Sequence, residues 1–155
     1  MRELDRFDRK ILDILQQEGR IAMTELAEKI GLSATPCSER VRRMERDGVI
    51  KGYCAQVNPR ALGLDLLVFV EIKLSAKSGD IFELVKRELQ SIPEVLECHL
   101  VSGDFDYLVK VRIHEMSEYR RMLGAILKRL PEPAESRSYI VMEEIKESLR
   151  LPVTA

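Results

Sequence analysis

Residues 24–50 read TELAEKIGLSATPCSERVRRMERDGVI and decide how the first third of the chain folds. Apolar residues at helical spacing predict a helix from Thr24, whose hydroxyl can cap it, to Gly31, where glycine tolerates the positive φ of a sharp turn. Ser33 is placed to cap a second helix that ends near Gly48. This second helix carries a group of arginines: Arg40, Arg42, Arg43 and Arg46. The stretch therefore predicts a helix-turn-helix that presents a basic helix to DNA.

The flanking sequence completes a small domain over residues 1–57. An earlier helix is predicted by one apolar stripe, Phe7, Ile11, Ile14 and Leu15. Asp5 is its expected cap and Gly19 its expected stop. After Gly48, residues 50–57 indicate an extended segment or ribbon. The residues expected to contact double-stranded DNA are Ser33, Thr35, Pro36, Ser38, Glu39, Arg42, Arg43, Arg46 and Lys51.

An ordinary helix surface is the alternative to DNA binding. Three short amphipathic helices with surface arginines also occur in domains that never meet nucleic acid. Glu39 and Asp47 lie four residues to either side of Arg43, so ion pairs along the helix account for part of the charge. Spacing alone leaves both interpretations open, with DNA binding favoured.

Composition narrows the class of protein. The formal net charge of −1 over 155 residues argues against indiscriminate coating of nucleic acid, so DNA contact requires local positive charge. Cys37, Cys54 and Cys98 are widely spaced and lack the neighbouring histidines of a zinc site, which favours buried, reduced thiols. The first thirty residues carry charges throughout, and nowhere do about eighteen apolar residues run together, so the sequence does not lead us to expect export or membrane insertion. We expect a cytoplasmic protein with no metal and no cofactor.

Beyond residues 58–65, the expected linker, the pattern changes from helical spacing to alternation. The predicted order is a strand through 68–74, a helix through 79–89, a strand over 94–102, a strand through 107–113, a helix through 119–127 and a strand over about 138–145. This βαββαβ order is the split pattern of a ferredoxin-like fold, here spanning residues 66–155. The fold class is α+β, a winged helix-turn-helix followed by this second domain.

The helices of such a fold cover one sheet face and leave the other bare. That second face is expected to mix apolar and charged residues: Leu67, Phe69, Leu96, Leu100 and Leu108 with Glu71, Lys73, Lys110 and Arg112. Pairing of two sheets in a homodimer suits this composition and would supply two-fold symmetry to paired DNA-binding helices. A monomer whose polar strand residues shield the apolar ones remains the alternative.

Residues 100–107, LVSGDFDY, place two carboxylates and a glycine at a strand connection. Such a loop can hold a small ligand with both charges, and an amino acid is one. A plain turn explains Asp104 and Gly103 equally well. Two rival functions are an amino-acid sensor without DNA binding and a small enzyme using Asp104 and Asp106. Catalysis is strongly disfavoured, because His99 and His114 lie in no nucleophile motif.

Several of these motifs together resemble the Lrp/AsnC family of transcription regulators over nearly the whole chain. The matching stretches are LDRFD at 4–8, GLSATPC at 31–37, ERVRR at 39–43, LLVFV at 66–70, ECHL at 97–100, GDFDY at 103–107 and YIVMEE at 139–144. The resemblance implies a winged helix-turn-helix, an amino-acid-binding domain with leucine as first candidate, and dimers that assemble into higher oligomers such as octamers.

By this resemblance, the effector site involves the connection at residues 100–107 and the contacts beside it. The residues that carry over are Leu100, Ser102, Gly103, Asp104, Asp106, Tyr107, Met116, Tyr139, Ile140 and Val141. Lys128 departs from the apolar residue that close relatives tend to carry there, which would alter either the pocket rim or the oligomer contact.

Overall fold

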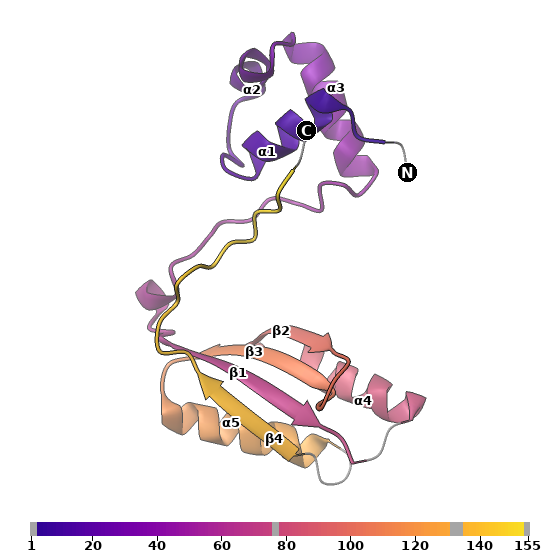
Figure 1. Ribbon diagram of the computed structural model, residues 1–155. Coiled ribbons are helices and arrows are strands. Elements are labelled where there is room, and N and C mark those ends of the chain that lie inside the picture. Colours follow the sequence, from indigo (N-terminus) through magenta and orange to yellow (C-terminus); the bar gives the residue numbers. More distant parts are fainter. Residues whose placement is uncertain (1–2, 76–77, 131–134, 154–155) are drawn as a thin grey trace. The chain divides into compact units, whose positions relative to one another are not determined.

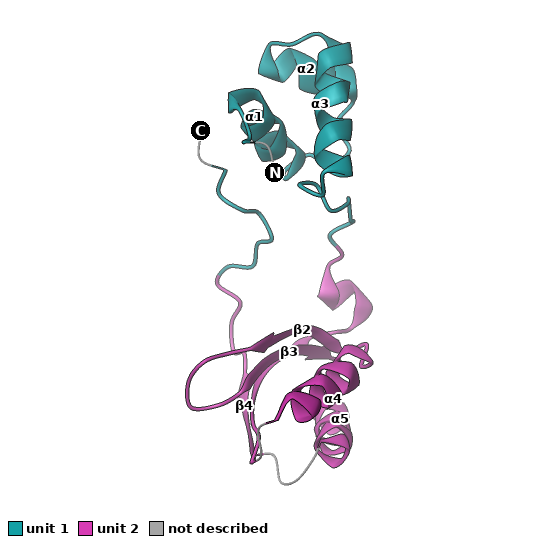
Figure 2. Ribbon diagram, turned by 90° about the vertical axis from the view of Figure 1, so that its right-hand side faces the viewer, with its two compact units in different colours: residues 1–56, 146–155 teal, residues 57–145 magenta. Residues whose placement is uncertain are grey.

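The two stretches with different periodicity fold as two units in the computed structural model, which describes residues 3–75, 78–130 and 135–153. One unit is Met1–Gln56 with Lys146–Ala155, and the other is Val57–Ile145 (Figure 2). The tail from Lys146 thus groups with the first unit, whereas a single domain over residues 66–155 was expected. No helix in the described ranges is long and apolar enough to cross a membrane.

The secondary structure follows the predicted order (Figure 1). The first unit holds α1 (Arg6–Leu15), α2 (Met23–Ile30) and α3 (Ala34–Arg46). The second holds η1 (Pro59–Leu62), β1 (Leu66–Lys73), α4 (Gly79–Gln90), β2 (Val95–Leu100), β3 (Tyr107–Ile113), α5 (Met116–Arg129) and β4 (Glu135–Ile140). The βαββαβ prediction is confirmed.

Helix α1 begins at the predicted cap. The Asp5 carboxylate accepts hydrogen bonds from the backbone N–H groups of Phe7 and Asp8, and the Asp8 carboxylate accepts one from the Asp5 N–H. This reciprocal capping box satisfies donors that the first turn leaves without helical partners. The helix ends at Leu15 with Gln16 as its C-cap, earlier than the stop expected at Gly19.

The turn between α2 and α3 has the expected backbone. Gly31 lies at φ 76° and ends α2, and Ser33 precedes α3 as its N-cap, although its side chain makes no capping hydrogen bond. The cap of α2 was wrongly placed, because the helix begins at Met23 after Ala22 and so includes Thr24 in its first turn. Both helices bury one apolar face in a shared core that includes Ile11, Leu26, Ile30, Cys37, Val41 and Met44.

The segment after α3 is extended but forms no strand between residues 50 and 57, so the wing exists here as chain without sheet pairing. The expected linker, residues 58–65, contains the short 3-10 helix η1, whose first turn is capped by Asn58. Of the cysteines expected to be buried, Cys37 is buried, Cys98 is half-buried and Cys54 is exposed.

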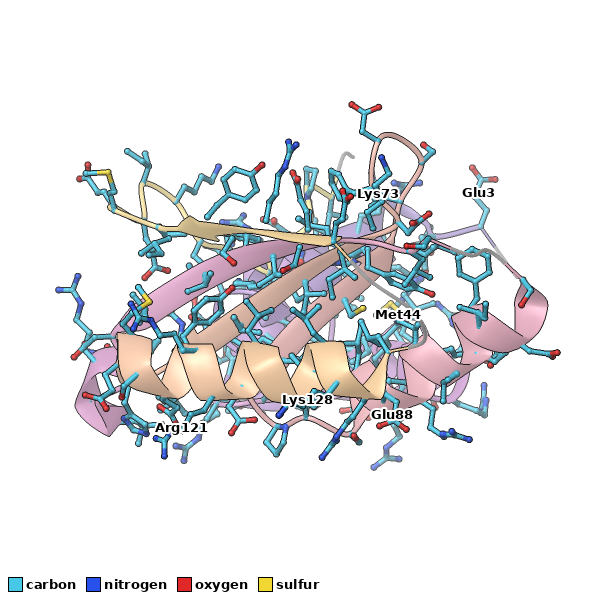
Figure 3. All side chains as sticks on the ribbon, turned by 90° about the horizontal axis from the view of Figure 1, so that it is seen from below. Glu3, Met44, Lys73, Glu88, Arg121 and Lys128 are labelled. Carbon is cyan, nitrogen blue, oxygen red and sulfur yellow. The ribbon has the colours of Figure 1, made fainter. Side chains whose placement is uncertain are left out.

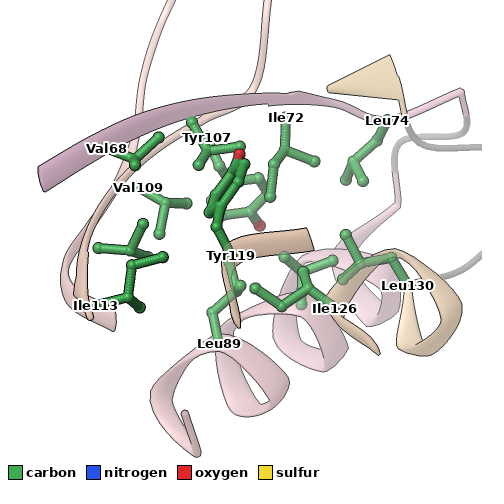
Figure 4. Close-up of a cluster of buried hydrophobic side chains, with 13 residues drawn as sticks. Val68, Ile72, Leu74, Leu89, Tyr107, Val109, Ile113, Tyr119, Ile126 and Leu130 are labelled. Atoms are coloured by element: carbon green, nitrogen blue, oxygen red, sulfur yellow. The ribbon is translucent and has the colours of Figure 1, made fainter. Parts of the chain in front are cut away.

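The second unit is a four-stranded antiparallel sheet in the order β2-β3-β1-β4. Helices α4 and α5 pack on one face (Figure 1). Alternate residues of β1 and β3 meet the helices in a core that includes Val68, Val70, Ile72, Tyr107, Val109, Val111, Leu89 and Ile126 (Figure 4). Burial of these side chains supplies the main driving force for this unit.

Two strand details differ from the prediction. A bulge between Val95 and Glu97 shifts the alternation of β2 by one residue, which pairs Leu100 with Tyr107. Leu100 therefore lies on the helix side of an edge strand, 62% exposed, and not on the bare face as expected. Strand β4 begins and ends earlier than expected. It ends early because its partner β1 begins at Leu66, so β1 has no further residues with which the chain beyond β4 could pair.

Candidate nucleic-acid interface and effector pocket

The outer face of α3 carries a single stripe of polar side chains. Cys37, Val41 and Met44 are buried and fix the rotation of the helix against its core. Their burial turns four exposed residues to the opposite side at helical spacing: Thr35, Glu39, Arg42 and Arg46. The stripe combines hydrogen-bonding groups near the N-terminal end with positive charge farther along. This combination allows base-edge contact at one end and phosphate contact at the other.

The remaining expected DNA contacts surround this stripe. Ser33 is exposed at the helix cap, Pro36 and Ser38 are half-buried in the first turns, and Lys51 is exposed beyond the helix. Arg46 keeps most of its side chain in solvent, with only a loose contact of 3.7 Å to Asp47. Thr35, Glu39, Arg42 and Arg46 thus share one exposed face of α3, with Ser33, Pro36 and Ser38 at its N-terminal end.

Arg43 is directed toward the start of α1. Its Nη2 lies 2.8 Å from Oδ1 and 3.0 Å from Oδ2 of Asp8, a carboxylate that is only 2% exposed. Arg40 completes the cluster, with Nη1 2.6 Å from Asp5 and 2.8 Å from Asp8. The two arginines hold α3 against the start of α1, because a buried carboxylate requires charged or hydrogen-bonding partners.

This cluster also sets the ionisation of the α1 cap. The backbone N–H of Asp8 and the Arg40 guanidinium hold the pKa of Asp5 at about 2, because both favour the charged carboxylate. Sequence reasoning missed Asp8 and Arg40. The spacing of Asp5 and Asp8 indicates a capping box, but their pairing with α3 depends on how two helices cross, which no local pattern specifies.

The sheet face away from the helices carries charges of both signs toward one end. Across β1 and β4, Glu71 lies opposite Arg137 and Lys73 opposite Glu135. In Figure 3, Lys73 lies on the side of the sheet away from α5, whereas Arg121 and Lys128 lie on the other side of that helix. Lys128 therefore does not border this charged end of the open face.

A pocket of about 230 Å³ opens at this end. Its walls come from β1, β4 and the connection between β2 and β3: Glu71, Lys73, Asp104, Phe105, Glu135, Ser136 and Arg137. Within the described residues, none of its five charged side chains is engaged in an ion pair with another residue. Charges of both signs beside an aromatic ring suit a small zwitterion with an apolar side chain.

The expected effector residues lie at the pocket, at or just beyond β4, and outside the pocket. Asp104 lines the pocket, and Gly103 beside it adopts φ 146°, a conformation that favours glycine. Ser102 is exposed in the same connection. Tyr139 lies farther along β4 on the open side, opposite Phe69, and Ile140 pairs with Val68 on the other side. Val141 follows the strand, and its N–H donates to the Leu67 carbonyl. Met116 begins α5 and Leu100 ends β2, both outside the pocket.

Asp106 and Tyr107 do not have the contacts expected of ligand-binding residues. The buried Asp106 carboxylate accepts the Leu74 N–H at 2.8 Å, and the Asp106 N–H donates to the Ile72 carbonyl at 2.9 Å. Asp106 thus fastens the connection to β1. Tyr107 lies in the helix-side core, with its hydroxyl 3.4 Å from the Phe82 carbonyl (Figure 4). Alternation along β3 forces this placement, since its neighbours Val109 and Val111 are buried on the same side.

Sequence reasoning missed the strand residues of the pocket. The available signal was charge at alternate positions, Glu71 with Lys73 and Glu135 with Arg137, which places both charges of each pair on one face. That signal identifies a charged face, but it does not show which strands are neighbours in the sheet. Among the residues that the structure describes, no three His, Cys, Asp or Glu side chains are grouped to hold a metal ion.

Comparison with known proteins matches each of the two parts of the chain to a known family. Residues 4–51 match the family described as winged helix-turn-helix DNA-binding, and residues 67–151 match the Lrp/AsnC ligand binding domain. The chain belongs to the Lrp/AsnC family. It is accordingly a DNA-binding transcriptional regulator with an amino-acid-binding domain, and the predicted resemblance is confirmed.

Individual relatives of this family cover nearly the full chain. The leucine-responsive regulatory protein of Escherichia coli K12 is 54% identical over 152 residues, which are 98% of this chain and 93% of the relative. An AsnC family regulator from Agrobacterium tumefaciens has a TM-score of 0.91 at 36% identity and 96% coverage of both chains. A Neisseria meningitidis regulator solved with L-Met has a TM-score of 0.90 at 32% identity and 97% coverage of both.

Proposed function

We propose that this chain regulates transcription in response to leucine or a similar small amino acid that binds in the pocket at Asp104. The observation that carries the proposal is the pocket itself, in which five charged side chains of both signs lack ion-pair partners within the described residues. Relatives named as leucine-responsive, and one solved with L-Met, support the ligand class.

The chemistry of the pocket matches the parts of an amino acid. Lys73 and Arg137 can receive an α-carboxylate, and Glu71, Asp104 or Glu135 can receive an α-ammonium group. Phe105 supplies apolar surface for an aliphatic side chain. The volume of about 230 Å³ lies below the roughly 300–1,000 Å³ of sites for drug-sized ligands, which favours a ligand of amino-acid size.

We further propose that α3 binds DNA through Thr35, Glu39, Arg42, Arg46 and the groups around them, with Arg43 in a structural role. The proposal rests on the exposed stripe opposite the buried face of α3. Lys51 follows the helix and is placed in sequence to add a phosphate contact. An amino-acid sensor that does not bind DNA would have no need for this stripe.

The open sheet face supports assembly into a homodimer and from there into higher oligomers, with an octamer as the expected size. Phe69 and Tyr139 lie side by side on this face, and Tyr139 is 48% exposed. Burying two such faces against each other removes apolar surface from water and provides two-fold symmetry for paired α3 helices. The alternative of a shielded monomer leaves these rings in solvent.

Catalysis at the turn between β2 and β3 receives no support from the geometry. The buried Asp106 carboxylate accepts the Leu74 N–H just after β1, which gives it a structural role instead of that of an acid or base beside Asp104. A regulator that binds chromosomal DNA acts where the DNA is, which supports the expected cytoplasmic location.

The test is thermal unfolding of the full chain against a panel of amino acids. Ligand at about 100 times its dissociation constant stabilises a protein by about 2.7 kcal/mol. We expect leucine or a relative to raise the melting temperature of the unchanged chain and of Arg121→Gln, a control on the opposite side of the second unit, but not of Arg137→Gln. Equal shifts in all three proteins would contradict the pocket assignment, and no shift with any amino acid would contradict the effector.

A further inference from the structure

The C-terminal tail makes specific contacts with α1 inside the first unit. The Gln16 amide donates from Nε2 to the Leu151 carbonyl at 3.1 Å and accepts from the Leu151 N–H at 2.7 Å. Beside it, the Arg150 guanidinium lies 2.7 Å from the Asp13 carboxylate. Asp13 and Gln16 are three residues apart and therefore share one face of the helix end.

These contacts recognise an extended main chain. A side-chain amide that both donates to and accepts from one residue reproduces the hydrogen-bonded pair of an antiparallel sheet. The ion pair to Arg150 then sets the register. The tail borders a cavity of about 660 Å³ whose other walls are the end of α1 and residues 52–56. The tail thus forms one wall of this cavity.

The same tail is fastened at its other end within the second unit. Arg112, only 6% exposed, places Nη2 2.6 Å from Glu144 and Nη1 3.5 Å from the Leu64 carbonyl. Glu144 follows β4, the strand that supplies Glu135, Ser136 and Arg137 to the pocket. Only residues 145–149 separate the Glu144 anchor from the Arg150 anchor.

We propose that Asp13 and Gln16 form a docking site for the C-terminal segment, and that the docked segment couples the pocket strand β4 to the DNA-binding unit. The linker over residues 58–65 alone would join the two units through one segment of chain. Docking of the tail adds residues 145–149 as a second, short connection. The contacts are exposed and individually weak, so they can form and release in response to ligand. The coupling rests on the proposed function as an amino-acid-responsive regulator. The docking rests only on the contacts of Asp13 and Gln16 with the tail.

The docking is tested by amide hydrogen exchange of the full chain at Leu151. In Gln16→Ala, which removes both amide contacts, we expect exchange at Leu151 to accelerate about tenfold. Gln17→Ala is the matched control, because Gln17 follows α1 and its side chain donates a hydrogen bond to the Asp13 carbonyl of that helix, not to the tail. Equal exchange rates in the unchanged chain and Gln16→Ala would overturn the docking site.

The coupling is tested by the ratio of DNA affinities with and without the amino acid that shifts the melting temperature. Asp13→Arg and Arg150→Asp should each reduce this ratio several-fold, and the double variant should restore it. Unchanged ratios in both single variants would overturn the coupling. A ratio of one in the unchanged chain would overturn the proposed function and the coupling with it, while exchange at Leu151 would still decide the docking.

Discussion

Arg42 and Arg43 are adjacent arginines on α3 that should fail in opposite ways when each is changed to glutamine. Arg42 is exposed, and Arg43 places its guanidinium on the buried carboxylate of Asp8. Glutamine preserves helix propensity, so the comparison isolates the guanidinium. Arg42→Gln should therefore report on DNA, and Arg43→Gln on folding.

The magnitudes follow from the surroundings of each side chain. Arg43→Gln removes two charge-assisted hydrogen bonds at 2.8 and 3.0 Å but leaves Arg40 on Asp8, so we expect a loss of about 1.5–3 kcal/mol in the free energy of unfolding. Arg42→Gln should change that free energy by less than about 0.5 kcal/mol. It should instead reduce the slope of log affinity against log salt by about 0.9 for each phosphate that the Arg42 guanidinium neutralises.

The assay is denaturant unfolding of both variants, followed by duplex DNA binding across a series of salt concentrations. Measuring both properties on both variants makes each the control for the other. An unchanged salt slope in Arg42→Gln, or a reduced slope in a fully stable Arg43→Gln, would refute the assignment of these two side chains.

Other predictions address the turn, the cap and the sheet face. Asp106→Ala should lower the free energy of unfolding by about 1–3 kcal/mol, because the Leu74 N–H loses its buried acceptor. It should also reduce the rise in melting temperature caused by the amino acid while DNA binding persists; a full rise would contradict this. Because folding lowers the pKa of Asp5 from 3.8 to about 2, its charged form stabilises the fold above about pH 4, and this contribution is lost as the pH falls toward 2. Asp5→Asn should lack this pH-dependent contribution when the free energy of unfolding is compared at pH 7 and pH 3. The same pH dependence in both proteins would argue against the cap. Tyr139→Glu should shift sedimentation toward monomer, since it puts charge beside Phe69 on the face proposed to pair; an unchanged mass would exclude this face.

The sequence was sufficient where function and packing are local. The cap at Asp5, the turn at Gly31 and the alternation in β1 each follow from one residue's chemistry or from spacing along one element. The βαββαβ order followed for the same reason. These features specify the fold class without reference to distant residues.

The sequence was insufficient where distant residues meet. The ion pair of Arg43 could not be foreseen because its partner Asp8 lies on another helix. Leu100 was placed on the wrong sheet face because the bulge earlier in β2 has no sequence signature of its own. Arg137 was overlooked in the pocket because its neighbour Glu71 is supplied by a strand far away in the chain.

The most direct test of the account is equilibrium binding of the full chain to duplexes selected from genomic DNA, at fixed salt, with and without saturating amino acid. Coupling free energies between sites are typically 1–3 kcal/mol, or about 5- to 150-fold in affinity. We predict a shift of that size with leucine or a close relative, abolished in Arg137→Gln. DNA affinity that stays the same with every amino acid would contradict the account.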